Sequence, residues 1–223
     1  MNTNVSISLG VHSGDHAIYP DCRPEFYKSL ILAFELGNWD SENVKLDLPY
    51  IEGDKESILL DAIISCSELD LDFDTIFANT NTSYDPDNDG RSSGKTGSDI
   101  ERILAFHAIG RKDPVEYQED WSDVLSHALS IEAEYMDKIY REKLTEIQYQ
   151  VTRNDATERA FSGIYDKHFE PGNYHCICCN HLLFKSTGKY NSGCGWPAFH
   201  TEDINANITR INDYSHGMTR VEV

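Results

Sequence analysis

The sequence predicts the α/β class, with a mostly helical module over residues 1–143 and a mostly β module over residues 144–223. Apolar residues follow helical spacing in the first module, whereas the second contains short strands broken by Gly, Pro and Asn. The charge also changes, from 12 basic and 29 acidic residues before position 144 to 7 and 9 after it. A shift this sharp indicates two modules of different origin.

Each element of the first module follows from local spacing. Alternating residues predict strands at 5–9 and 44–48. Apolar residues at helical spacing predict helices at 24–37, 55–69, 98–110 and 121–144, and Pro24 and Gly37 suit the two ends of the first helix. Residues 80–97 form a polar loop. From residue 145 onward, we expect only short strands and turns.

Composition excludes several classes of function. The net charge of −19 would repel nucleic-acid phosphates, so we expect no nucleic-acid partner. The chain has no apolar run near 18 residues, and its N-terminus does not resemble a secretory signal, so we expect no membrane association. Six clustered cysteines are too few for a disulfide scaffold, which favours a reducing, cytoplasmic compartment.

The second module carries two cysteines at a spacing common in metal sites, Cys176-x-x-Cys179. This spacing lets two thiolates reach one zinc ion at about 2.3 Å, but structural zinc needs four ligands. No second pair follows before Val223, and Cys178 lies inside the pair, where its geometry is poorer. The alternative is that Cys176 and Cys179 are free thiols of a hydrophobic core.

A single cysteine and a tryptophan follow in the run Ser192-Gly-Cys-Gly-Trp-Pro197. Glycines on both sides leave the backbone of Cys194 free to move toward a partner thiol. The rigid indole of Trp196 can select a methyl group by dispersion and shape. The alternative for Trp196 is a core residue beside a turn.

These segments resemble the peptide-methionine (R)-S-oxide reductase (MsrB) family. The similar segments are residues 148–152 (QYQVT), 157–158 (TE), 161–163 (FSG), 172–176 (GNYHC), 183–184 (LF), 192–197 (SGCGWP) and 215–218 (SHGM). The resemblance begins at residues 144–145 and covers about the first two-thirds of that domain. It implies thiol-based reduction of methionine-(R)-sulfoxide in proteins, with thioredoxin as the usual reductant.

The resemblance also implies roles for single residues. Cys194 is the resolving cysteine, Trp196 is the wall against the substrate methyl group, and Cys176 and Cys179 are half of a zinc site. The family's nucleophilic cysteine and second zinc pair belong to the C-terminal third, which has no counterpart in these residues. We therefore predict little or no reductase activity for this chain and doubtful zinc occupancy.

Residues 5 to about 117 resemble the C-terminal part of the 7-cyano-7-deazaguanine synthase (QueC) family of queuosine biosynthesis. The similar segments are residues 9–15 (LGVHSGD), 19–26 (YPDCRPEF), 82–84 (TSY), 93–99 (SGKTGSD), 101–102 (ER), 105–106 (AF) and 110–114 (GRKDP). The resemblance implies an incomplete nucleotide-hydrolase-like fold, with Tyr19, Asp21 and Arg23 at the substrate pocket. The alternative is a surface loop with a local Asp–Arg pair.

This module also departs from its family. The family's four zinc cysteines fall at Ser83, Ser93, Thr96 and Asp99, so we predict no zinc there. Its pyrophosphate loop has no counterpart, so we predict no ATP-dependent nitrile synthesis. Three hypotheses remain: an incomplete sulfoxide reductase, a remnant of a deazaguanine synthase, and a non-catalytic fusion of two incomplete folds.

Overall fold

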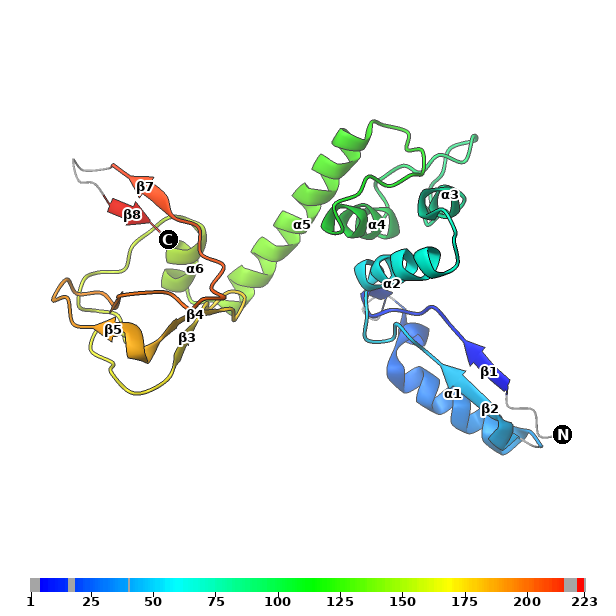
Figure 1. Ribbon diagram of the computed structural model, residues 1–223, viewed down its shortest axis with the longest axis horizontal. Coiled ribbons are helices and arrows are strands. Elements are labelled where there is room, and N and C mark those ends of the chain that lie inside the picture. The colour runs from blue at the N-terminus through cyan, green and yellow to red at the C-terminus, as the bar shows by residue number, and fades with distance from the viewer. Residues whose placement is uncertain (1–4, 16–18, 40, 215–219, 223) are drawn as a thin grey trace. The chain divides into compact units, whose positions relative to one another are not determined.

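A computed structural model describes residues 5–15, 19–39, 41–214 and 220–222 (Figure 1). The chain divides into two compact units, residues 1–133 and 134–223, and each is described by itself. The mixed α/β class is confirmed, with helices dominating the first unit and small antiparallel strand pairs in the second. Helix α5 (Trp121–Lys143) crosses the division, and the module boundary at residues 143–144 stays a prediction.

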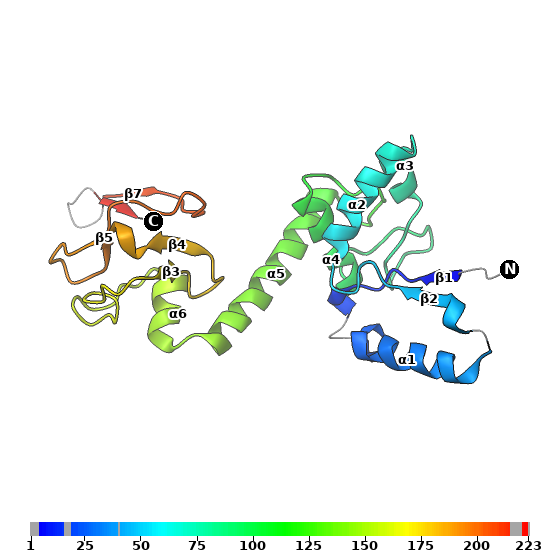
Figure 2. The same cartoon turned by 60° about the horizontal axis from the view of Figure 1, so that its bottom comes forward.

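The first unit combines one strand pair with helices. Its elements are β1 (Val5–Ser8), α1 (Pro24–Gly37), β2 (Val44–Asp47), α2 (Lys55–Glu68), α3 (Phe73–Ala78), α4 (Gly97–Ala108) and the start of α5. Strands β1 and β2 pair in parallel, and α1 connects them (Figure 2). Helix α3 was not predicted; it is short, and the Asp72 side chain caps it by accepting from the Thr75 N–H at 2.7 Å.

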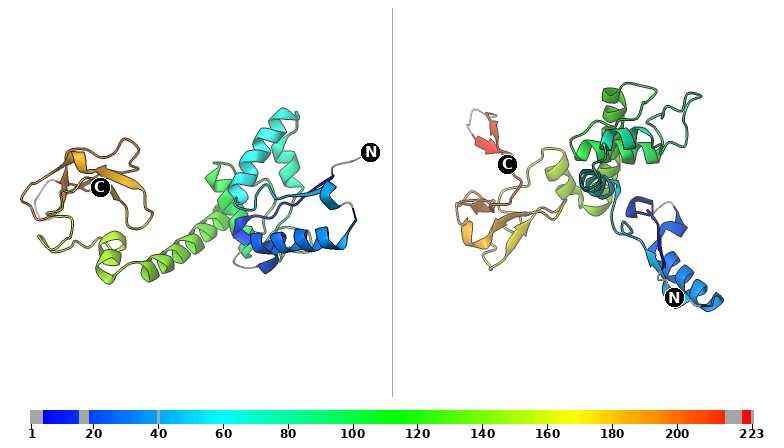
Figure 3. Two further views of the ribbon diagram at one scale, coloured as in Figure 1. Left: turned by 90° about the horizontal axis from the view of Figure 1, so that it is seen from below. Right: turned by 45° about the vertical axis from the view of Figure 1, so that its right-hand side comes forward.

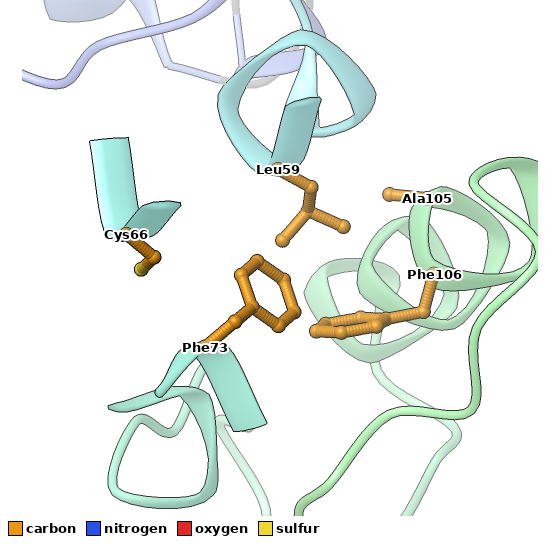
Figure 4. Packing of buried hydrophobic residues seen from close by; sticks show 5 residues of the cluster. All are labelled: Leu59, Cys66, Phe73, Ala105 and Phe106. Carbon is orange, nitrogen blue, oxygen red and sulfur yellow. The ribbon is translucent and has the colours of Figure 1, made fainter. Parts of the chain in front are cut away.

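The core of the first unit lies among α2, α3 and α4. Leu59, Phe73 and Phe106 point toward one another in Figure 4, and Cys66 and Ala105 complete the buried cluster. The rings of Phe73 and Phe106 meet edge to face, with centroids 6.2 Å apart. A second cluster joins α4 to α5 through Ile103, Val124 and Ala128. The two clusters together pack α4 against α2, α3 and α5.

A buried ion pair lies beside this core. The Arg102 guanidinium donates to both carboxylate oxygens of Asp113, at 2.5 and 2.8 Å, and Asp113 is fully buried. The Tyr117 hydroxyl donates to the same carboxylate at 2.8 Å. Burial, followed by the Asp113 charge, raises the pKa of Tyr117 far above its usual value. Every charge in this cluster therefore has a hydrogen-bonded partner.

The second unit contains the rest of α5, α6 (Glu146–Arg153) and three strand pairs, visible from other directions in Figure 3. The strands are β3 (Asn173–His175), β4 (Leu182–Lys185), β5 (Lys189–Tyr190), β6 (Ala198–Phe199), β7 (Ile211–Asp213) and β8 (Arg220–Glu222). They pair antiparallel as β3–β4, β5–β6 and β7–β8. Stacked Phe184 and Phe199 rings, with centroids 4.3 Å apart, join β4 to β6.

Helix α6 corrects the expectation that only strands and turns follow residue 145. The backbone N–H of Thr145 donates to the Gln148 side chain at 3.0 Å, which is half of a capping box. The hydroxyl of Tyr149 donates to Asp137 of α5 at 2.5 Å and fixes the helix there. None of the helices in the described ranges combines the length and hydrophobicity needed to span a bilayer.

Candidate functional site

The loop after β5 presents Cys194 and Trp196 to solvent. The Cys194 thiol is exposed, and Trp196 keeps 37% of its surface accessible, so neither belongs to a hydrophobic core. The Ser192 hydroxyl donates to Cys194 Sγ at 2.8 Å, and this sulfur also contacts the Trp196 carbonyl at 3.5 Å. The Ser192 hydrogen bond is the main reason that the pKa of Cys194 is lowered. The site therefore presents, on one loop, an accessible thiol with a lowered pKa and an accessible indole two residues later.

A neighbouring segment fixes the indole. Trp196 Nε1 donates to the Glu158 carbonyl at 3.1 Å, and the Phe161 N–H donates to the Gly195 carbonyl at 2.8 Å. Gly195 has a φ of +91°, and a Cβ there would lie 2.8 Å from the Phe161 nitrogen, so only glycine fits. Phe161 itself has a φ of +65°, a conformation uncommon for an aromatic residue. The sequence pattern did not single out these backbone contacts.

The thiol pair lies in the tight turn between β3 and β4. The Asn180 N–H donates to the Cys176 carbonyl, and the Cys176 N–H donates to the His181 carbonyl, both at 2.8 Å. Asn180 has a φ of +62°, which lets the chain reverse. Burial alone would raise the pKa of Cys176, but hydrogen bonds from the backbone at Cys179 and Cys178 outweigh it and lower the pKa. Cys179 is exposed, so the pair is not a set of core thiols.

The donor types in this turn suit zinc. It carries two thiols, and backbone donors lower the pKa of one of them, Cys176, which favours the thiolate form that binds zinc. Across the described ranges, however, no group of three or more His, Cys, Asp or Glu side chains could hold a metal ion. The two nearby histidine rings already contact backbone carbonyls. His175 Nδ1 lies 2.9 Å from the Asn180 carbonyl oxygen, and His181 Nε2 lies 2.8 Å from the Asn205 carbonyl oxygen.

The predicted substrate loop of the first unit lies partly beside a pocket. The pocket has a volume of about 580 Å³, and Tyr19 lines it together with His12, Lys55 and Glu101. Asp21 and Arg23 are not among its lining residues; both are exposed, Asp21 within a short 3₁₀ turn and Arg23 directly before α1. The structure thus brings Tyr19, but not the other two, to this pocket.

Comparisons with known proteins separate the two parts of the chain. Residues 144–223 match the SelR domain family. A peptide methionine sulfoxide reductase MsrB of Cellvibrio japonicus is 45% identical over 95 residues, which cover 43% of this chain and 68% of that protein. An MsrB of Pseudomonas savastanoi pv. phaseolicola is 48% identical over 94 residues, covering 40% of this chain and 72% of that protein.

The chain belongs to the MsrB family. Residues 144–223 are called the MsrB module below, and they contain Cys176, Cys179, Cys194 and Trp196. Another MsrB relative, from Variovorax paradoxus, is 51% identical over 74 residues, covering 33% of this chain and 54% of that protein. The similar segment at residues 215–218 lies outside the described residues.

Residues 2–110 match the family of the queuosine biosynthesis protein QueC. The expected similarity of the N-terminal module is therefore confirmed, and the match includes Tyr19, Asp21 and Arg23. It also includes the positions Ser83, Ser93, Thr96 and Asp99.

Proposed function

We propose that the MsrB module carries the resolving-thiol half of a methionine-(R)-sulfoxide reductase site. Cys194 is the resolving cysteine, and the Trp196 indole is the wall that selects the substrate methyl group. The observation that carries the proposal is one loop, held by hydrogen bonds, that exposes both the Cys194 sulfur and the Trp196 indole, with Ser192 donating to the sulfur. Oxidised methionine in proteins is the substrate, and thioredoxin is the reductant.

The chemistry assigns one step to Cys194. An attacking thiol takes the sulfoxide oxygen, releases methionine and becomes a sulfenic acid. The Cys194 thiolate then attacks that sulfur and displaces hydroxide, which leaves as water after taking a proton, and a disulfide remains. Thioredoxin returns both sulfurs to thiols by exchange. A lowered pKa at Cys194 supports this step because thiolate is the reactive form.

The attacking thiol is not assigned to any cysteine of these 223 residues. No cysteine follows Cys194 in the sequence, and the other thiols of the MsrB module belong to the turn at residues 176–179. Cys176 and Cys179 are assigned to half of a zinc site, which needs two further ligands. We therefore propose that these residues alone bind the substrate but turn it over little or not at all.

Binding and turnover together test the proposal. Titration of the full chain with peptides containing either sulfoxide epimer should show preferential binding of the R epimer, which Trp196→Ala abolishes. Trp39→Ala is the matched control, because Trp39 is 97% exposed and lies in the other unit. Equal binding of both epimers would contradict the assignment of Trp196. Multiple turnover with thioredoxin, thioredoxin reductase and NADPH would overturn the proposed inactivity alone.

A further inference from the structure

Three residues from separate parts of one loop contact a single buried carboxylate on α4. Asp99 is 1% exposed, and its Oδ2 accepts from the Ser83 hydroxyl at 2.9 Å and the Ser93 hydroxyl at 3.2 Å. The Thr96 N–H reaches the same oxygen at 3.3 Å, and the Asp99 N–H donates to Thr96 Oγ1 at 3.2 Å. We call these four residues the Asp99 cluster.

This donor set does not fit the zinc ion implied by the QueC resemblance. Structural zinc is held by thiolates and imidazoles, whereas the cluster offers three hydroxyls and one carboxylate. The hydroxyls of Ser83 and Ser93 are already committed as donors to Asp99. Asp99 Oδ2 is the one atom that the Ser83 hydroxyl, the Ser93 hydroxyl and the Thr96 N–H all contact, so it connects the four positions.

We infer that the Asp99 carboxylate takes the structural role of a metal ion by holding the loop of residues 80–96 against the N-terminus of α4. We call this link the Asp99 clasp. The inference goes beyond the proposed function, since it concerns the other module. The hydrogen bond from Ser83 joins residues 16 positions apart in the sequence, and the one from Ser93 joins residues 6 positions apart. One carboxylate therefore closes two loops. Such long-range closure is what a structural metal supplies.

The surroundings explain how a buried charge is tolerated there. Asp99 is the third residue of α4, where the helix dipole favours negative charge, and it forms a capping box with Thr96. Two further hydrogen bonds hold the same loop. Ser98 Oγ donates to the Thr82 carbonyl at 2.6 Å, and the Gln118 N–H donates to the Ser92 carbonyl at 2.9 Å. Asp99 Oδ1 has no hydrogen-bond partner among the described residues, so Oδ2 carries the clasp.

The clasp also shapes the pocket described above. Thr82, Ser83, Gly97 and Ser98 line that pocket, and all four lie in the clasped loop or at the start of α4. Gly94 brings the loop close to α5: its φ is +73°, and a Cβ there would lie 2.6 Å from Val124 Cγ1. Releasing Asp99 would therefore loosen one wall of the pocket.

The test uses the full chain with Cys176→Ser and Cys179→Ser as a common background, so that bound metal reports only on the N-terminal module. In this background, hydrogen exchange at residues 81–99 should be slow and unchanged by a chelator. Asp99→Asn should accelerate it by about tenfold or more, because the charged acceptor is lost. His107→Gln is the control on the same helix, because His107 is exposed, and it should leave the exchange at Ser83 and Ser93 unchanged.

A second variant tests whether a bound zinc ion can take the place of the Asp99 clasp. Changing Ser83, Ser93, Thr96 and Asp99 together to Cys places four thiols around one point, and this variant should bind about one zinc ion per chain. Its exchange should be slow with zinc and fast after chelation. Stoichiometric metal in the background protein, chelator-sensitive exchange there, or unchanged exchange in Asp99→Asn would each overturn the inference. A four-cysteine variant that folds without binding zinc would do so as well.

Discussion

The Asp99 cluster and the Cys176 turn (residues 176–181) are the two regions for which the family resemblances imply a zinc site. They differ in the donor groups that this chain has there. In the Asp99 cluster, this chain has hydroxyls and one carboxylate where the QueC resemblance implies thiols, and these groups hydrogen-bond to one another. The Cys176 turn has two thiols, and the described residues supply no further ligands to them. The first set of groups therefore satisfies itself, whereas two thiols need ligands from elsewhere to hold a zinc ion.

The largest expected effect tests how far the first unit depends on closed polar networks. Asp113→Ala leaves the buried Arg102 guanidinium and the Tyr117 hydroxyl without their acceptor. We expect the free energy of unfolding of the first unit to fall by about 3–5 kcal/mol, as measured by chemical denaturation.

The matched control is Asp74→Ala, which breaks the solvent-accessible pair between Arg111 and Asp74. Its cost should not exceed about 1 kcal/mol, because water screens exposed ion pairs. Similar losses in the two variants would show that the buried network contributes no more than a surface pair.

The second prediction concerns metal retention by the Cys176 turn. After dialysis, the full chain should hold far less than one zinc ion per chain, because two thiolates leave half of the tetrahedral site open. Cys176→Ser should remove the weak binding that remains, and Cys178→Ser should reduce it less. Stoichiometric zinc in the dialysed protein, measured by elemental analysis, would show that the half-site finds its missing ligands.

Much of the helical part of this molecule could be predicted from the sequence, since helices such as α1, α2 and α4 have apolar spacing and clear end signals. Helix α6 could not, because its eight residues carry little spacing signal and depend on Gln148 and on a contact with Asp137 of α5. Short elements depend on such tertiary contacts, which a local pattern does not contain.

The candidate sites show the same limit. Cys194 and Trp196 were found by their flanking glycines and proline, and Cys176 and Cys179 by their spacing. The Glu158 carbonyl that holds the indole is a backbone group, and no side-chain pattern could reveal it. Likewise, Ser83 and Ser93 were expected only to lack zinc. Their bonds to Asp99 join residues that the sequence separates by a polar loop.

A third prediction concerns the reactivity of Cys194. Because the Ser192 hydroxyl lowers the pKa of Cys194, thiolate is present at a lower pH than for an ordinary cysteine. Ser192→Ala should shift the pH profile of iodoacetamide alkylation at Cys194 upward and slow the reaction a few-fold near neutral pH. The two rates should converge well above the usual cysteine pKa. Ser186→Ala, in a different turn of the module, is the control, and mass spectrometry of the labelled peptide is the measurement.

The smallest expected effect provides a scale for the Asp99 clasp. Asp54 resembles Asp99 in its bonding: it lies at the start of α2, and its side chain accepts from the Ser57 N–H at 2.8 Å and the Ser57 hydroxyl at 2.9 Å. Unlike Asp99, it is exposed. Asp54→Ala should therefore cost only about 1 kcal/mol of unfolding free energy at neutral pH, the usual value of an N-terminal cap.

The pH dependence of this difference follows from the direction of the shift. The Ser57 backbone bond, followed by the Ser57 side chain, lowers the pKa of Asp54 in the folded protein. The stabilisation is therefore present above the ordinary aspartate pKa and disappears as the pH falls through the lowered value. Denaturation of wild type and Asp54→Ala across this range should show two curves that converge at acidic pH. If Asp54→Ala instead cost as much as Asp99→Asn, burial would not distinguish the two carboxylates, and the contrast between a local cap and a long-range clasp would fail.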